Sequence, residues 1–270
     1  MARHQDGKNR ERGFDPLRGA GDRRHGPPRA NSTGDGADWL WGRHAVEAAL
    51  ANPRRRVLRL LVAEGHAAPA NAQMIEHVGA GEFARELPSN AVHQGLALLA
   101  DPPKPTLLET LAEPAEGTMV LLDGVTDPQN VGAVFRSAAA FGARGVILQD
   151  RHAPPLSAAL AKAAAGAVDV VGHARVVNLS RALETLADLG WRAVGLDGSA
   201  EETLEQALDA RPTVLVLGSE GAGLRRLVAE HCDTTARIAM PGGFDSLNVS
   251  AAAAVALYEA SRRQSAGERG

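Results

Sequence analysis

Hydrophobic and polar positions alternate in blocks along most of the chain. From Thr118 onward, uninterrupted apolar runs occupy residues 119–124, 145–150, 191–198 and 213–221. Helical patterns separate or follow them, at residues 130–141, 156–166, 179–189 and 201–209. Apolar runs without alternation indicate strands covered on both faces, and strands that alternate with helices indicate a parallel sheet. The pattern predicts an α/β fold, a parallel sheet with helices on both faces, over residues 118–262.

The segment before this sheet has a different pattern and predicts a small α/β module over residues 38–101. We expect a helix, a strand, a second helix and a closing strand, at residues 43–51, 57–63, 71–80 and 93–101. Residues 102–117 contain four prolines, which favours a linker between two domains with room for one helical turn.

The two ends of the chain are predicted to be disordered, over residues 1–37 and 263–270. Residues 1–36 hold eight basic and five acidic residues, whereas the remainder holds 21 basic and 27 acidic residues. A basic, glycine-rich segment with few large apolar side chains cannot bury enough surface to fold alone. This tail either adds non-specific affinity for nucleic acid or is solvated without a role.

The number of cysteines and the lengths of the apolar runs indicate the cellular compartment of the protein. The single cysteine, Cys232, excludes an internal disulfide, is typical of a reducing compartment and is expected to be a small buried side chain. Residues 1–13 lack the apolar core of a secretory signal, and no apolar run approaches the roughly 18 residues that span a bilayer. We expect a soluble cytoplasmic protein.

The first candidate loop leads into the helix predicted at residues 130–141. Ligands of open parallel sheets bind beyond the carboxyl ends of the strands, so loops at these ends are the places to search. Arg136 lies among residues that are apolar or small on nearly every side. It is therefore a structural ion pair, a side chain that extends to the surface, or a ligand for phosphate or carboxylate. Asn130 is either a capping group or a polar contact in the same pocket.

The second candidate loop follows the strand at 213–221. Gly218, Gly221 and Gly223 permit tight turns and a close approach of the backbone to a ligand. The spacing matches neither a P-loop nor the G-x-G-x-x-G dinucleotide motif. Glu220 has three interpretations: it binds a polar ligand, orients Asn130 or Arg136, or faces solvent.

The third candidate loop precedes the last helix, in the stretch MPGGFDSLNVSAAAAVALYEA. Residues 234–240 are predicted to be a strand, and an alanine-rich helix starts soon after a Pro-Gly-Gly turn. Asp245, Ser246, Asn248 and Ser250 supply more capping groups than one helix end needs. We expect Ser246 or Asn248 to cap the helix and the others to line a pocket at its positive end.

Together the three loops resemble the SpoU (TrmH-like) family of RNA ribose 2'-O-methyltransferases, within the SPOUT class. The family motif N-x-G-x-x-x-R matches Asn130, Gly132 and Arg136. The second motif matches residues 218–221 and 223–224, and the third matches Ile238, Met240, Gly242 and residues 246–250. The likeness covers residues 118–262, in order and with the family's spacing. It is closest to the bacterial enzymes that methylate a guanosine ribose in 23S ribosomal RNA.

The resemblance implies features that periodicity does not predict. It implies a carboxyl-terminal trefoil knot, S-adenosylmethionine as the cofactor, no metal, and a homodimer whose active site draws on both subunits. The stretches WGRHAVEAAL and HQGLALLAD are similar to the L30e-like domain that binds substrate RNA in family members.

Residue roles are also implied by motif position. The cofactor would be held at Leu217, Gly218, Ile238, Met240 and Leu247. Asn130, Glu220, Ser246 and Asn248 would shape the catalytic pocket. Arg136 would bind an RNA phosphate and favour the developing alkoxide, because a pKa above about 12 makes arginine a poor base.

Other functions compete with this interpretation. A tRNA ribose 2'-O-methyltransferase would use the same motifs, although the amino-terminal module favours a ribosomal substrate. A non-catalytic RNA-binding factor for ribosome assembly would be expected to have lost some of the motif residues, and a nicotinamide-dependent enzyme would carry the missing glycine motif. Arg54, Arg55 and Arg56 form either an RNA-contacting turn or a solvated run of charge.

Overall fold

The carboxyl-terminal domain is built on a six-stranded sheet. The computed structural model describes residues 36–243 and 246–267. The strand order is β10-β8-β9-β5-β6-β7, and all neighbours pair in parallel. The strands are β5 (Thr118–Leu122), β6 (Gly145–Gln149), β7 (Gly172–Val176), β8 (Arg192–Leu196), β9 (Thr213–Leu217) and β10 (Thr234–Ala236). The predicted parallel sheet is confirmed, and β7 is an additional strand at its edge.

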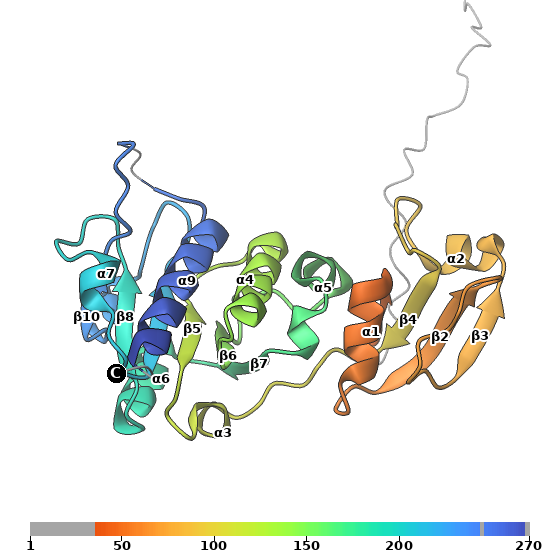
Figure 1. Cartoon of the computed structure of the whole chain (residues 1–270), viewed down its shortest axis with the longest axis horizontal. Helices are drawn as coiled ribbons and strands as arrows, with labels where there is room; N and C mark the ends of the chain where they lie inside the picture. The colour runs from red at the N-terminus through yellow and green to blue at the C-terminus, as the bar shows by residue number, and fades with distance from the viewer. Residues whose placement is uncertain (1–35, 244–245, 268–270) are drawn as a thin grey trace, which may run out of the picture.

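Helices cover both faces of this sheet, as predicted (Figure 1). One layer contains α4 (Pro128–Ala140), α5 (Ala158–Ala164), α7 (Leu204–Ala207) and α9 (Val249–Gly267). The other contains α3 (Leu108–Ala112), α6 (Leu179–Asp188) and α8 (Arg226–Glu230). In β5, Val120 and Leu122 pack beneath the first layer and Met119 and Leu121 beneath the second. Successive strand residues point to opposite faces, which explains why the strands are continuously apolar.

The amino-terminal module is a four-stranded mixed sheet with two helices. Its strands, in the order β1-β4-β2-β3, are β1 (Asp38–Trp41), β4 (Leu96–Ala100), β2 (Val57–Ala63) and β3 (Ile75–Val78). β4 pairs antiparallel with β1 and β2, and β2 pairs in parallel with β3. Its helices are α1 (Arg43–Ala51) and α2 (Ala80–Glu86).

One prediction within the module is wrong. Residues 71–80 were expected to be helical, but Ile75–Val78 form β3 and helix α2 starts only at Ala80. The side chains of β3 alternate between exposed and half-buried, as expected of a strand at a sheet edge. A short segment with few apolar residues fits either period, and pairing with β2 decides between them.

Two predicted boundaries also change. Leu108 and Leu111 of α3 are buried in the carboxyl-terminal core, so the second half of the predicted linker belongs to that domain. Helix α9 continues to Gly267, so residues 263–267 are helical rather than disordered. Most of the predicted basic tail, residues 1–35, lies outside the described residues, whereas Ala37 is fully buried in the module.

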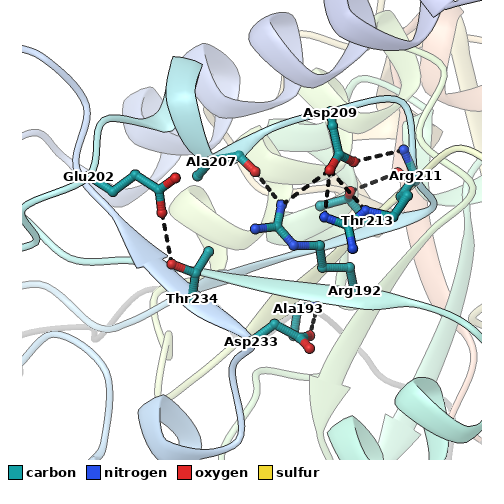
Figure 2. Close-up of polar contacts among 9 residues, drawn as sticks. All are labelled: Arg192, Ala193, Glu202, Ala207, Asp209, Arg211, Thr213, Asp233 and Thr234. Atoms are coloured by element: carbon teal, nitrogen blue, oxygen red, sulfur yellow. Dashed lines mark hydrogen bonds and ion pairs between the residues drawn. The ribbon is translucent and has the colours of Figure 1, made fainter.

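A polar cluster joins the strands at the amino edge of the sheet (Figure 2). Arg192 donates to the carbonyl oxygen of Ala207, and its guanidinium lies 4.0 Å from the Asp209 carboxylate. Arg211 also binds Asp209, with 2.6 Å between Nη2 and Oδ2. The Asp233 carboxylate accepts a hydrogen bond from the Ala193 backbone nitrogen, at 2.7 Å. We call residues 192, 209, 211 and 233 the amino-edge cluster.

Two further expectations concern Cys232 and the membrane. Cys232 is half-buried against the second helix layer, and burial raises the pKa of its thiol to about 12. Among the described residues, no helix is both long enough and apolar enough to cross a bilayer.

Candidate active site

A pocket of about 570 Å³ lies at the carboxyl edge of the sheet. Four segments line it: the ends of β8 and β9, the segment through and beyond β10, and the start of α9. The lining residues are 196–198, 217–221, 223, 236, 238, 240, 246–249 and 252. A pocket of this size and position is suited to a small-molecule ligand.

Most of the sequence-predicted site residues meet in this pocket. Its lining includes Leu217, Gly218, Glu220, Ile238, Met240, Ser246, Leu247 and Asn248. Asn130 contacts the pocket wall through hydrogen bonds, whereas Arg136 is not among the lining residues. The second and third loops therefore form the pocket, and the first loop supports it.

A hydrogen-bond network joins the three loops. Oε1 of Glu220 accepts from Nδ2 of Asn130 at 3.1 Å and from Nδ2 of Asn248 at 2.7 Å. The same amide of Asn248 lies 3.0 Å from Oδ1 of Asn130. Oε1 of Glu220 also lies 3.4 Å from the backbone nitrogen of Val249. Glu220 thus holds the starts of α4 and α9 against the loop after β9. We call Asn130, Glu220 and Asn248 the carboxyl-edge network.

Asn248 caps helix α9. Its Oδ1 accepts from the backbone nitrogens of Ser250, at 2.9 Å, and Ala251, at 3.3 Å, and from the Ser250 hydroxyl at 2.6 Å. Because Oδ1 faces these donors, the side-chain nitrogen must face Glu220. One capping group is therefore sufficient, and Ser246 lines the pocket instead. Asp245 lies outside the described residues.

The loop after β9 is closed on itself. The backbones of Ser219 and Gly223 exchange two hydrogen bonds, at 3.2 and 3.0 Å. A Cβ on Gly218 would lie 2.1 Å from the carbonyl carbon of Gly223, so only glycine fits at position 218. The predicted need for glycine at this position has this physical cause.

Sequence reasoning missed the anchor of that loop. The fully buried Asp123 carboxylate accepts from the backbone nitrogen of Arg225 at 2.8 Å and from its Nε at 2.6 Å. Asp123 follows β5 and Arg225 follows the second motif, so the pair fixes the far end of the loop. The only signal was an acidic residue at the end of a buried apolar run.

The pocket carries uncompensated negative charge. Asp197 and Glu220 are in its lining, and none of the described lining residues is Lys, Arg or His. Backbone and side-chain hydrogen bonds from Ser199, at 2.8 and 2.7 Å, lower the pKa of Asp197 and keep it ionised at neutral pH. Two carboxylates without a neighbouring cation favour a positively charged ligand group.

The surroundings of Arg136 are less apolar than the sequence indicated. Helix α4 leaves Gln129, Arg136 and Ala140 on one exposed stripe, so the side chain extends to the surface, which was one of its three interpretations. No group in the described part of the chain pairs with the Arg136 guanidinium. The side chain is therefore free to bind an anion outside this chain.

The three arginines of the predicted basic turn, residues 54–56, differ in their exposure. The Arg55 side chain is 2% exposed and lies 3.4 Å from Asp169, so it cannot contact RNA at the surface. Arg54 and Arg56 remain exposed.

Within the described residues, no three His, Cys, Asp or Glu side chains gather in a way that would hold a metal ion.

Known proteins are similar to this chain in sequence and in fold. Residues 117–258 match the model of the SpoU rRNA Methylase family. The 23S rRNA (guanosine-2'-O-)-methyltransferase RlmB of Pseudomonas aeruginosa is 42% identical over 83% of this chain and 96% of its own length. The enzyme of the same name from Pseudomonas syringae pv. tomato is 39% identical over 84% and 96%.

Solved structures agree with these matches. The SpoU methyltransferase AviRb from Streptomyces viridochromogenes, in complex with AdoMet, has a TM-score of 0.72 and 26% identity over 85% of this chain and 91% of its own. The AdoMet-bound rRNA methyltransferase from Sinorhizobium meliloti has a TM-score of 0.71 and 26% identity over 84% and 87%. With its three motifs gathered around one pocket, this chain belongs to the SpoU rRNA methylase family.

Proposed function

We propose that this chain is an S-adenosylmethionine-dependent RNA ribose 2'-O-methyltransferase whose substrate is a guanosine of 23S ribosomal RNA. The observation that carries the proposal is the acidic pocket closed by Asn130, Glu220 and Asn248. The choice of substrate is supported by relatives whose sequences align with more than four-fifths of the chain and that bear this activity in their names.

The pocket residues fit S-adenosylmethionine. The sulfonium group is a cation, and the pocket offers the carboxylates of Asp197 and Glu220 without a competing basic side chain among its described lining residues. We assign Leu217, Gly218, Ile238, Met240 and Leu247 to hold the cofactor, largely through their backbone groups. The cofactor supplies a methyl group that is already activated for transfer.

The protein's own contribution is positioning and electrostatics. Glu220 already accepts three hydrogen bonds, so its role is to orient Asn130 and Asn248 rather than to remove a proton. Ser246 presents a hydroxyl to the same pocket. Arg136 binds the phosphate beside the target ribose and stabilises the 2'-oxygen as it loses its proton.

A homodimer completes this site in our proposal. Helices α4 and α9 lie in one layer, so their exposed stripes both point away from the sheet (Figure 1). The α9 stripe includes Val255, 41% exposed, and Tyr258, 52% exposed, and the α4 stripe includes Arg136. Apolar side chains at such exposure favour a partner surface. Arg136 would then serve the pocket of the other subunit.

The remaining parts of the proposal concern the fold and the compartment. We infer a trefoil knot, because α9 returns from beyond the edge strand β10 to pack on the central strands β5 and β9, past the closed loop at Gly218. The amino-terminal module is proposed to bind RNA as an L30e-like domain. Because the proposed substrate is ribosomal RNA, we propose that the enzyme acts in the cytoplasm.

The test is methyl transfer from tritiated S-adenosylmethionine. The protein is incubated separately with 23S rRNA, assembled large-subunit particles and bulk tRNA, and alkali-resistant dinucleotides are mapped. Label at one rRNA guanosine, free or assembled, supports the proposal. Label in tRNA supports the proposed reaction and overturns the proposed substrate. No label in any of them, with the cofactor bound, assigns the chain to a non-catalytic RNA-binding role.

A further inference from the structure

The module and the carboxyl-terminal domain share one apolar core. A single buried cluster contains residues of both, including Leu40, Val46 and Ala49 from the module and Leu156, Ala164 and Val168 from the domain. The expected linker does not hold two separate bodies apart, because the apolar surfaces of α1 and β1 are covered by α5 and the 3-10 helix η1 (Ala167–Asp169). Figure 1 shows α5 between α1 and α4.

A buried polar cluster lies within this interface. Arg55 of the module lies 3.4 Å from Asp169 of η1, with side chains only 2% and 1% exposed. Nδ2 of Asn52 donates to the same oxygen of Asp169 at 3.0 Å. Removing one partner of such a pair leaves a buried charge without compensation, whereas replacing both by apolar groups is often neutral. The cluster therefore fixes the geometry of the interface more than it adds stability.

A second contact crosses the interface at the start of α5. Among the described residues, Ser157 at the N-cap position makes no capping hydrogen bond through its side chain. Instead Oδ2 of Asp38, from β1 of the module, accepts from the backbone nitrogen of Ala158 at 2.9 Å. A residue of the module thus satisfies a helix end of the domain.

Two glycines extend these contacts to the helix that carries Arg136. A Cβ on Gly166, which has φ +91°, would lie 2.7 Å from Cβ of Ala48 on α1. A Cβ on Gly132 of α4 would lie 2.6 Å from Cβ of Ala163 on α5. Because neither glycine has a Cβ, α1 approaches the segment after α5 closely and α5 approaches α4 closely, so the position of α1 is coupled to that of α4.

We propose that Arg55, Asn52, Asp169 and Asp38 are positioning residues that lock the module to the catalytic domain as one rigid unit, and so determine which ribose the module presents to the site. The rigid connection between the two domains does not depend on the proposed function. Its effect on the choice of ribose rests on the proposed function. In the protein, burial lowers the pKa of Arg55 and raises that of Asp169, and each opposes the shift of the other.

The rigid connection is tested by a distance measurement on the full chain. Spin labels at His77→Cys on β3 and Ala187→Cys on α6, both exposed, report the separation of the two domains in a Cys232→Ala background. We expect one narrow distance distribution, a broad one in Arg55→Met, and a narrow one again in Arg55→Met/Asp169→Leu. A broad distance distribution in the spin-labelled protein with Arg55 and Asp169 unchanged overturns the proposal.

The effect on the choice of ribose is tested by kinetics on 23S rRNA. Arg55→Met should raise the KM for rRNA at least tenfold, with S-adenosylmethionine affinity within twofold, and the double variant should recover most of this loss. Arg85→Met is the matched control, because Arg85 lies on α2 of the module, outside the basic turn, is 78% exposed and loses the same charge. It should change KM by less than twofold and leave the distance distribution narrow.

The outcomes separate the proposals. If no RNA is methylated, the proposed function fails while the distance result still decides the lock. If Arg55→Met broadens the distribution but its KM equals that of Arg85→Met, the lock does not set substrate presentation. Should Arg55→Met not fold, as judged by circular dichroism, Asp38→Ala supplies the same two measurements with a smaller expected change of about threefold in KM.

Discussion

The two edges of the sheet carry polar clusters with different charge balance. In the amino-edge cluster the Asp209 carboxylate is paired with Arg211 and Arg192 (Figure 2). At the carboxyl edge, the groups of residues 36–243 and 246–267 that bind the Glu220 carboxylate are all amide or backbone N–H groups. Both clusters are held by hydrogen bonds, but among the described residues only the amino-edge cluster neutralises its charge. Hydrogen-bond satisfaction alone therefore does not distinguish a structural cluster from a binding site, whereas charge balance does.

The position of Arg136 adds to the difference in charge between the two edges of the sheet. The sequence places an arginine within the motif that contributes Asn130, yet the structure directs it away from the carboxylates of the pocket and onto an exposed stripe. In our proposal the site thus keeps its anionic part, the pocket, apart from its cationic part, Arg136. A cofactor cation and an RNA phosphate would each meet the opposite charge.

The largest effect is expected from Arg136→Ala. If Arg136 binds the RNA phosphate as proposed, its removal should reduce methyl transfer by about 100-fold or more, because stabilisation of the developing charge is lost. S-adenosylmethionine affinity, measured by calorimetry, should stay within about threefold, because Arg136 does not line the pocket. Arg181→Ala, an exposed arginine on α6, is the matched control and should be active. Collapse of cofactor binding in Arg136→Ala would assign this arginine to the cofactor side.

Mixing two inactive variants tests whether the cationic part comes from a second subunit. Arg136→Ala and Gly218→Val chains, unfolded and refolded together, should recover about one quarter of the wild-type activity. The reason is that half of the randomly formed dimers are mixed, and each mixed dimer has one complete site. Activity that stays at the level of the separate variants would show that Arg136 serves its own pocket.

A smaller effect is expected from Glu220→Gln. The change removes one negative charge but keeps an oxygen acceptor, so cofactor affinity should fall about tenfold while the fold persists. The matched change at the other edge is Asp209→Asn, which also removes one carboxylate charge. Calorimetry should give unchanged cofactor affinity for Asp209→Asn. Equal losses of cofactor affinity in Glu220→Gln and Asp209→Asn would show that the negative charge of the pocket does not contribute specifically to cofactor binding.

The smallest effect is expected from Asp209→Ala. The Arg211 and Asp209 side chains are 63% and 45% exposed, and exposed ion pairs contribute about 0.2–1 kcal/mol. The free energy of unfolding, from urea titration, should fall by no more than about 1 kcal/mol without loss of methyl transfer. A loss several times larger would show that the amino-edge cluster supports the sheet more strongly than its exposure suggests.

The sequence predicted the parts of this molecule that depend on local pattern. Continuous apolar runs predicted the buried strands β5, β6, β8 and β9, because strands covered on both faces lack polar positions. The surplus of capping groups before α9 correctly predicted that only one of them would cap the helix. Short segments such as β3 were ambiguous, because few apolar residues do not distinguish a period of 2 from 3.6.

The rest depends on residues far apart in the chain. The exposure of Arg136 follows from which sides of α4 are covered by α5 and α9, and composition does not contain that information. The Asp123–Arg225 anchor joins residues 102 positions apart, and the Asp38–Ala158 contact joins residues 120 apart. The buried position of Arg55 reversed the expectation of a surface charge because Asp169, on a distant element, compensates it.

The measurement that tests the account most directly is calorimetric titration of S-adenosylmethionine into the wild type and Gly218→Val. The new side chain would collide with the Gly223 backbone, 2.1 Å from the position of its Cβ, and open the loop that walls the pocket. Gly81→Ala on α2 is the control, because Gly81 lies outside the three motifs and a Cβ there would have no atom of the described residues within 4 Å. We predict one cofactor per chain in the wild type and the control, and no binding in Gly218→Val. Equal binding in all three proteins would contradict the assignment of the carboxyl-edge pocket as the cofactor site.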